Sequence, residues 1–343
     1  MKTEEFIMKY SSELQPVYKR MALQIQELLT SILADNNITP HSTTCREKDP
    51  ESLRLKIGKE GKSYNDPLDE ITDLAGVRII TYFPSEVDKI IPIIEKEFKI
   101  DKKNSIDKRK TSDPTVFGYV SVHLIVEFSS DRIKLPEYSR YKGMKCEIQV
   151  RTILQHAWAE IEHDIVYKSS EDIPFELRRK FASLSGLLEI ADREFETLRQ
   201  DEIKIRKEIH ETINRDNIDI PIDLDSLRFY FEKYHNEKKI GSFVLSKLNK
   251  FVQSKNITTI EQLHKILTVS ALANVSNDVL TFSKLCHSTN RCFIKYFFVL
   301  GDYFKLSRHE MGTLIDCPAM EDEARYKMKR KVFEEKKPEK NHE

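Results

Sequence analysis

Three short runs rich in β-branched and aromatic residues, set between helical patterns, constrain the fold of this chain most. They cover Val77 to Phe83, Tyr119 to Phe128 and Lys145 to Arg151. Such side chains favour strands, whereas the flanking stretches repeat apolar residues at the spacing of three and four that is typical of helices. We therefore expect residues 46–151 to form an α/β (α+β) domain.

The length of the chain favours more than one structural unit, because 343 residues exceed what one hydrophobic core usually absorbs. An amphipathic pattern predicts an N-terminal helical segment over residues 1–40. The α/β section and a long trailing helix fill residues 41–213, and a segment rich in Asp, Asn, Ile and Pro then marks a boundary. We expect a helical domain of unknown role over 226–320 and a charged tail over 321–343.

The trailing helix carries an apolar seam whose members alternate steps of four and three residues. They are Leu177, Phe181, Leu184, Leu188, Ala191, Phe195 and Leu198. Such a seam packs either against the chain's own helices or against a second chain as a coiled coil. The short length of the seam and the presence of Gly186 favour packing against the chain's own helices.

Charge and hydropathy exclude several classes of protein. Lys plus Arg and Asp plus Glu both number 56, so no global positive field attracts nucleic acid, and phosphate chemistry must depend on local clusters. The N-terminus lacks an apolar run of signal-peptide length, and no run is long enough to span a membrane. We expect a cytoplasmic protein that does not act at a membrane.

Strand alternation gives two of the predicted strands a polar face. The polar residues are Tyr119, Ser121 and His123 in one strand and Glu147, Gln149 and Arg151 in the other. Asp73 stands just before the first strand, and Arg78 lies within it. A carboxylate at a strand edge can bind Mg²⁺, and a guanidinium in a half-buried strand can bind a base or a phosphate. Edge strands that face water, a turn aspartate and a structural ion pair are the alternatives.

A basic segment precedes Asp73 and ends as a short helix. It contains Arg46, Lys48, Ser52 and Lys56. Ser52 and Lys56 are four residues apart and share a helical face, so a hydroxyl and a cation could converge on a polyphosphate. A solvated basic helix would contain the same residues, so this segment alone does not decide between the two interpretations.

Taken in order along the chain, these residues resemble the synthetase pattern of the RelA/SpoT family. The matching set is Arg46-x-Lys48, Ser52, Lys56, Asp73, Arg78, Gly118-Tyr119-x-Ser121-x-His123, Glu147-Ile148-Gln149-Val150-Arg151-Thr152 and Trp158-Ala159-x-x-Glu162-His163-x-x-x-Tyr167-Lys168. The resemblance implies a nucleotidyltransferase-like mixed sheet flanked by helices. It also implies an enzyme that transfers a pyrophosphoryl group from ATP to a nucleotide hydroxyl.

The resemblance implies a role for each residue of the pattern. Asp73 and Glu147 would be the catalytic pair, binding Mg²⁺ and activating the acceptor hydroxyl. ATP would be bound by Arg46, Lys48, Ser52, Lys56 and Arg78, and the acceptor by Tyr119, His123, Gln149 and Arg151. Phosphoryl transfer needs these residue types, because the protein mostly positions groups in line and neutralises spreading charge.

One departure from the family pattern concerns the acceptor. Many members have a lysine four residues before the acceptor tyrosine, where this chain has Thr115, and the basic cluster Lys102 to Lys110 could supply the missing charge. We expect GDP or GTP as the acceptor. The alternatives are a toxin-type enzyme that modifies the tRNA 3′ end or makes adenosine alarmones, and an inactive nucleotide sensor. Whatever the acceptor is, the helical C-terminal region could serve a homo-oligomer or bind a protein partner.

Overall fold

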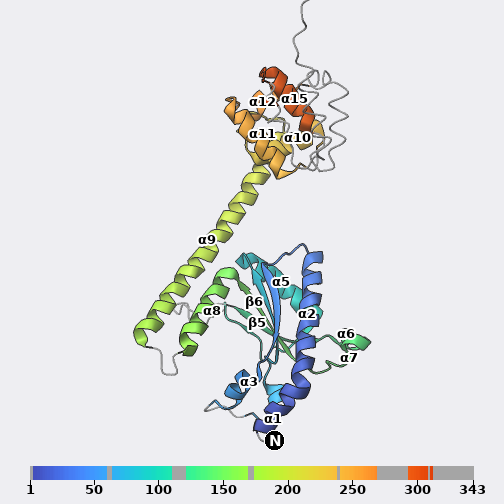
Figure 1. The fold of residues 1–343 in the computed structure, drawn as a ribbon, viewed down its shortest axis with the longest axis vertical. Helices are drawn as coiled ribbons and strands as arrows, with labels where there is room; N and C mark the ends of the chain where they lie inside the picture. Colours follow the sequence, from blue (N-terminus) through green and yellow to red (C-terminus); the bar gives the residue numbers. More distant parts are fainter. Residues whose placement is uncertain are drawn as a thin grey trace, which may run out of the picture. The chain divides into compact units, whose positions relative to one another are not determined.

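The computed structural model divides the chain into two compact units, Met1–Gln200 and Asp201–Glu343 (Figure 1). It describes residues 3–59, 64–109, 121–168, 174–237, 240–268, 293–307 and 310–311. The first unit contains the sheet and the polar residues of the sequence pattern that the structure describes. The described part of the second unit is helical.

A six-stranded mixed sheet forms the centre of the first unit, in the order β1-β2-β6-β5-β3, with β4 paired to β5 outside this path. β2 and β6 are parallel, and the other pairs are antiparallel. The strands are β1 (Ser42–Glu47), β2 (Ala75–Thr81), β3 (Phe98–Ile100), β4 (Ile106–Asp107), β5 (Val122–Phe128) and β6 (Cys146–Thr152). The expected α/β fold with a mixed sheet is confirmed, although β1, β3 and β4 were not predicted.

Helices α2 (Gln15–Asp35) and α5 (Pro84–Glu97) cover the apolar face of the sheet (Figure 1). Val77, Ile148 and Leu124 lie side by side on β2, β6 and β5 and are buried on that face. They belong to one hydrophobic core together with residues of the N-terminal helices. A buried aliphatic side chain contributes about 1.5 to 3 kcal/mol, so residues 3–35 are an integral part of this unit's stability.

The N-terminal helical segment also supports the backbone next to the basic residues. Helix α1 (Thr3–Lys9) passes through a π-turn (Tyr10–Leu14) before α2 begins, and Pro16 occupies the first turn of α2, where its missing N–H costs nothing. The buried Tyr10 hydroxyl donates a hydrogen bond to the carbonyl oxygen of Lys48 at 2.8 Å. The interrupted helix therefore fixes the backbone at Lys48.

Short helices connect the strands, and two longer helices follow the sheet. The short ones are α3 (Pro50–Ile57), α4 (Pro67–Glu70), α6 (Ser130–Ile133) and α7 (Pro136–Ser139). Helix α8 (Ile153–Lys168) packs on β6 and β2, and α9 (Phe175–Asn214) follows it. In Figure 1, α8 lies on the opposite side of the sheet from α2. The polar face of the sheet is therefore the face toward α8.

The second unit has a hydrophobic core of its own. Its described helices are α10 (Leu224–His235), α11 (Ser242–Ser254), α12 (Ile260–Ile266) and α15 (Phe293–Tyr303). Residues 269–292 and the predicted charged tail 321–343 lie outside the described residues. Among the helices that the structure describes, none is long and apolar enough to cross a membrane.

A buried carboxyl ties α9 to the end of β6. Asp192 is 4% exposed, and the Thr152 hydroxyl donates to its Oδ2 at 2.6 Å. Burial raises the pKa of Asp192 to about 6, although the hydrogen bond from Thr152 opposes this shift. Because the pKa is higher in the folded than in the unfolded state, the folded chain loses stability as pH rises through this range.

We expect Asp192→Asn to stabilise the first unit at pH 8, where the wild-type carboxyl is ionised and buried. The gain in the free energy of unfolding should be about 1 to 3 kcal/mol at pH 8 and should shrink toward pH 4. Urea unfolding followed by the fluorescence of Trp158, the single tryptophan, reports on this unit. Asp201→Asn, at an exposed position of the same helix, is the control. An Asp192→Asn gain that is the same at both pH values would contradict this origin.

Candidate active site

Two rows of residues cross the polar face of the sheet. The first row consists of Thr44, Arg78, Gln149 and His123, one each on β1, β2, β6 and β5. The second row consists of Arg46, Gly76, Glu147 and Ile125. Directly opposed residues of neighbouring strands project from the same face of a sheet. The strand register therefore gathers residues that are far apart in the sequence.

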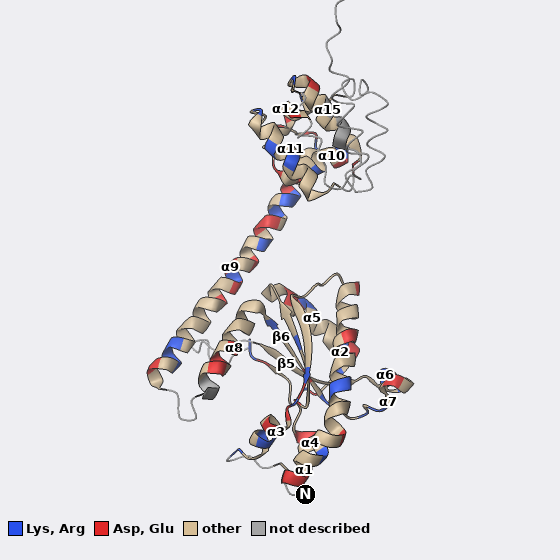
Figure 2. Ribbon diagram, in the orientation of Figure 1, with Lys and Arg blue, Asp and Glu red and all other residues tan. Residues whose placement is uncertain are grey.

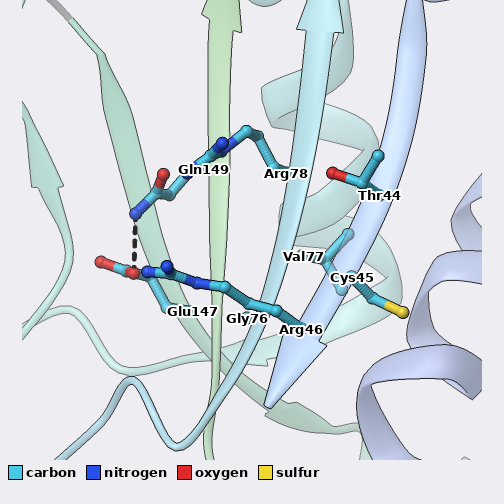
Figure 3. Close-up of a pocket in the computed structure, with 8 residues that line it drawn as sticks. All are labelled: Thr44, Cys45, Arg46, Gly76, Val77, Arg78, Glu147 and Gln149. Atoms are coloured by element: carbon cyan, nitrogen blue, oxygen red, sulfur yellow. Dashed lines mark hydrogen bonds between the residues drawn. The ribbon is translucent and has the colours of Figure 1, made fainter. Parts of the chain in front are cut away.

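The side chain of Arg46 crosses this face above Gly76 (Figure 3). In Figure 3, Arg46 extends over Gly76 toward Glu147, and Arg78 extends toward Gln149. A Cβ atom built at Gly76 would lie 3.6 Å from the Cγ of Arg46. A pocket at this position is lined by Thr44, Cys45, Arg46, Gly76, Val77, Arg78, Glu147 and Gln149. Sequence reasoning did not single out Gly76, which lies between Arg46 and Glu147 in the strand register.

Asp73 lies in the turn before β2 and binds two lysines. Lys48 Nζ donates to its Oδ2 at 2.7 Å, and Lys56 Nζ donates to its Oδ1 at 2.8 Å. Burial alone would raise the pKa of Asp73, but the hydrogen bonds and charges of the two ammonium groups outweigh it and hold this pKa below its usual value. Asp73 is therefore an ionised carboxylate at neutral pH.

The two lysines reach Asp73 from different elements. Lys48 follows β1, and its backbone N–H donates to the carbonyl of Leu74. Lys56 lies on α3, which Asp49 caps by accepting the Ser52 backbone N–H at 2.9 Å. Ser52 is exposed and lies one turn before Lys56 on this helix. The interpretation as a solvated basic helix is therefore wrong for Lys56, whose ammonium group is bound to a carboxylate.

Glu147 is the second carboxylate of the site and is held by two neighbours. His123 Nδ1 lies 2.8 Å from Glu147 Oε1, and Gln149 Nε2 donates to Oε2 at 2.8 Å. Burial and the charge of Asp73 raise the pKa of Glu147, whereas the hydrogen bonds from His123 and Gln149 lower it, and the result lies below the usual value. An ionised carboxylate only accepts hydrogen bonds, so Nδ1 of His123 carries the hydrogen.

Glu160 of α8 connects two arginines at the other end of the polar face. Arg78 Nη1 donates to Glu160 Oε1 at 2.8 Å, and Arg151 Nη2 donates to the same atom at 3.2 Å. Arg151 is 3% exposed, whereas Arg78 is half-buried. The sequence pattern gives no signal for this contact, because Glu160 and Arg78 are 82 positions apart in the chain.

The structure thus brings most of the predicted site residues to one face and its edge. Tyr119 and Thr115 lie outside the described residues. The assignment of Gln149 and Arg151 to the acceptor stays a prediction, and their described contacts are with Glu147 and Glu160. Within the described part of the chain, no cluster of three or more His, Cys, Asp or Glu could hold a metal. Two ionised carboxylates suit Mg²⁺, which takes one or two of them plus substrate phosphates.

Comparison with known proteins identifies the family to which this chain belongs. Residues 45–172 match the family model described as the region found in RelA / SpoT proteins. GTP pyrophosphokinase YwaC of Bacillus subtilis (strain 168) is 33% identical over 169 residues, which cover 47% of this chain and 77% of that protein. GTP pyrophosphokinase YjbM of the same organism is 32% identical over 139 residues, or 39% of this chain and 61% of that protein.

The fold of this chain is also similar to that of a protein of known structure. Small alarmone synthetase 1 from Bacillus subtilis is similar with a TM-score of 0.48 and 22% identity, over 57% of this chain and 99% of that one. The sequence relatives define the class, because both are named GTP pyrophosphokinases. This chain belongs to the RelA/SpoT family and is a pyrophosphokinase.

Proposed function

We propose that this chain transfers the β,γ-pyrophosphoryl group of ATP to the 3′-hydroxyl of GDP or GTP. The acceptor oxygen bonds to the β-phosphorus, the bond between that phosphorus and the α,β-bridging oxygen breaks, and AMP leaves with that oxygen. The observation that carries the proposal is the pair of ionised carboxylates, Asp73 and Glu147, on a face that also presents Arg46 and Arg78. The relatives named GTP pyrophosphokinase support the same reaction.

The part of the site that would bind ATP contains two arginines and two lysines. Arg46 and Arg78 line the pocket, and a guanidinium can stack on the adenine base. Lys48 and Lys56 are bound to Asp73, and both ammonium groups can turn toward a polyphosphate whose charge exceeds that of one carboxylate. Ser52, one turn from Lys56, would donate its hydroxyl to the same phosphates. We infer that the lysines exchange Asp73 for the triphosphate when ATP binds.

The acceptor hydroxyl needs a group that takes its proton. Glu147 is ionised and is held in place by His123 and Gln149, so it suits the role of a fixed base. Asp73 and Glu147 would hold Mg²⁺, which would neutralise charge on the phosphate oxygens when bound. The alternative of an inactive nucleotide sensor gives no reason for two half-buried, ionised carboxylates at one site.

The cations of the basic cluster Lys102 to Lys110 differ in their contacts. Arg109 binds Asp88 at 2.6 Å and Asp107 at 2.9 Å, so its charge is already matched. Lys108 follows β4, and its backbone N–H donates to the carbonyl of Ser121. Its charge acts on Glu162 of α8, so it lies on the α8 side of the sheet. We therefore assign Lys108 to the acceptor phosphates in place of the lysine that the family pattern has where this chain has Thr115.

We predict that Lys108→Ala raises the KM for GDP or GTP about tenfold while the KM for ATP changes little, because one fixed charge near the acceptor phosphates is lost. Lys102→Ala, at an exposed turn position of the same cluster, is the matched control. Initial rates with labelled ATP at varied acceptor concentrations give both constants. An equal change in both constants would mean that Lys108 supports the fold rather than the acceptor.

The identity of the acceptor is tested in the same assay. Labelled ATP is supplied with GDP, GTP, ATP alone or deacylated tRNA, at low and moderate salt. Label on guanosine nucleotides, with weak salt dependence, supports the proposed acceptor. Label on tRNA alone, falling steeply with salt as counterion release predicts, would reject it while leaving pyrophosphoryl transfer intact.

A further inference from the structure

Glu160 occupies a position of α8 that the family pattern leaves open, yet it joins this helix to two strands of the sheet. Arg78 Nη1 of β2 donates to Glu160 Oε1 at 2.8 Å, and Arg151 Nη2 of β6 donates to the same oxygen at 3.2 Å. Figure 2 shows basic positions on the central strands and acidic positions on α8, which packs against β2 and β6. The helix and the strands therefore have complementary charges at this contact.

The carboxylate of Glu160 is held in place although 53% of its side chain is exposed. Arg151 is buried, and a buried side chain in a packed interior has little freedom to change its rotamer. Burial would raise the pKa of Glu160, but the charges of Arg78 and Arg151 outweigh it and hold this pKa below its usual value. An ionised acceptor, fixed by Arg151, therefore binds the guanidinium of Arg78 in a charge-assisted hydrogen bond.

The two arginines that line the pocket differ in how they are held. Arg78 is half-buried and bound to Glu160, whereas Arg46 is exposed. Among the described residues, the guanidinium of Arg46 has no hydrogen-bond or ion-pair partner. A side chain that becomes ordered only when a ligand binds loses rotamer freedom at that moment, which weakens binding. Arg78 is therefore preorganised for a flat ligand, whereas Arg46 must still be ordered.

We propose that Glu160 is a positioning residue for the base of ATP, because it fixes the guanidinium plane of Arg78 on which the adenine stacks. The inference rests on the proposed function, in which Arg46 and Arg78 bind the adenine. The hydrogen bond to Glu160 does not compete with stacking, since the N–H groups of a guanidinium lie in its plane and a base contacts its face. The base contacts the fixed Arg78 first, and Arg46 then becomes ordered against the bound nucleotide.

The first test separates binding of the base from binding of the phosphates. The probes are α,β-methylene ATP, in which carbon replaces the oxygen that leaves, and ribose 5-triphosphate, which lacks the base. In calorimetric titrations, Glu160→Leu should weaken binding of the first about tenfold and change the second less than about twofold, because only the base stacks on Arg78. Glu160→Gln, whose amide oxygen still accepts from Arg78, should stay within about threefold of the wild type. Equal weakening of both probes, or of neither, by Glu160→Leu would overturn the proposal.

The second test asks whether Glu160 acts through Arg78. In an Arg78→Ala background, Glu160→Leu should cause no further loss of affinity for α,β-methylene ATP, because the residue that it positions is missing. In an Arg46→Ala background, the loss of about tenfold should persist. Glu95→Leu, at an exposed position of α5 on the apolar side of the sheet, is the matched control and should change the affinity for neither probe. A loss that Glu160→Leu still causes without Arg78 would refute the positioning role.

Turnover distinguishes this inference from the proposed function. With GDP or GTP as the acceptor, Glu160→Leu should raise the KM for ATP about tenfold and change kcat less than about twofold, since Glu160 does not touch the reacting atoms. A protein that binds α,β-methylene ATP in a Glu160-dependent way but transfers nothing would reject the proposed function and retain the role of Glu160. A Glu160→Leu protein with the turnover and the KM for ATP of the wild type would retain the function and overturn the role of Glu160.

Discussion

Asp73→Asn is expected to lower the turnover number of pyrophosphoryl transfer by about a hundredfold or more. The substitution keeps the side-chain volume but removes the charge that binds Lys48 at 2.7 Å and Lys56 at 2.8 Å. The amide would also turn an N–H group toward one of these ammonium groups. The substitution therefore removes a proposed Mg²⁺ ligand and, at the same time, the group that positions the two lysines proposed to bind phosphate.

The control for this variant is Asp69→Asn, four residues upstream, where the carboxylate also binds a lysine, Lys145, at 3.2 Å. It should retain wild-type turnover. Circular dichroism and Trp158 fluorescence check that both variants stay folded. A folded Asp73→Asn protein with a turnover number close to that of the wild type would remove Asp73 from the proposed chemistry.

The sequence singles out the polar residues of this face, but it does not predict strand β1, which brings Arg46 to them. Arg46 stands out in the sequence as a cation. Its strand β1 begins with three polar residues before Cys45, and these give no clear strand signal. The antiparallel pairing with β2 places Arg46 opposite Gly76, and parallel pairing with β6 places Gly76 opposite Glu147. Such pairings between distant segments have no local signal, because the register is set by the whole sheet.

Helical periodicity has a related limit. The steps of three and four along α9 correctly define an apolar face, since the spacing of side chains on a helix is local geometry. They do not say on which side of the helix the rest of the chain lies. Here Thr152, Ser85 and Glu86 supply polar partners to α9. Leu184, Phe195 and Leu198 of the predicted seam are exposed, whereas Phe181 and Leu188 are half-buried.

Glu147→Gln is expected to reduce turnover by a similar factor, about a hundredfold, with the KM for ATP changed little. Glutamine cannot take the proton of the acceptor hydroxyl. It also presents an N–H group where the carboxylate now accepts from His123 or Gln149, both at 2.8 Å. Because the pKa of Glu147 is held below its usual value, the wild type should lose activity only when the pH falls through that lowered pKa.

The pH profile separates a proton acceptor from a structural residue. If Glu147 accepts the proton, the residual activity of Glu147→Gln lacks the acidic limb that this carboxylate gives the wild type. Glu127→Gln is the matched control, because Glu127 lies on β5 of the same sheet, is 20% exposed against 16% for Glu147, and binds Lys99 at 3.0 Å. It should keep both the rate and the acidic limb. A Glu147→Gln protein whose residual rate falls with pH as in the wild type would show that another group takes the proton.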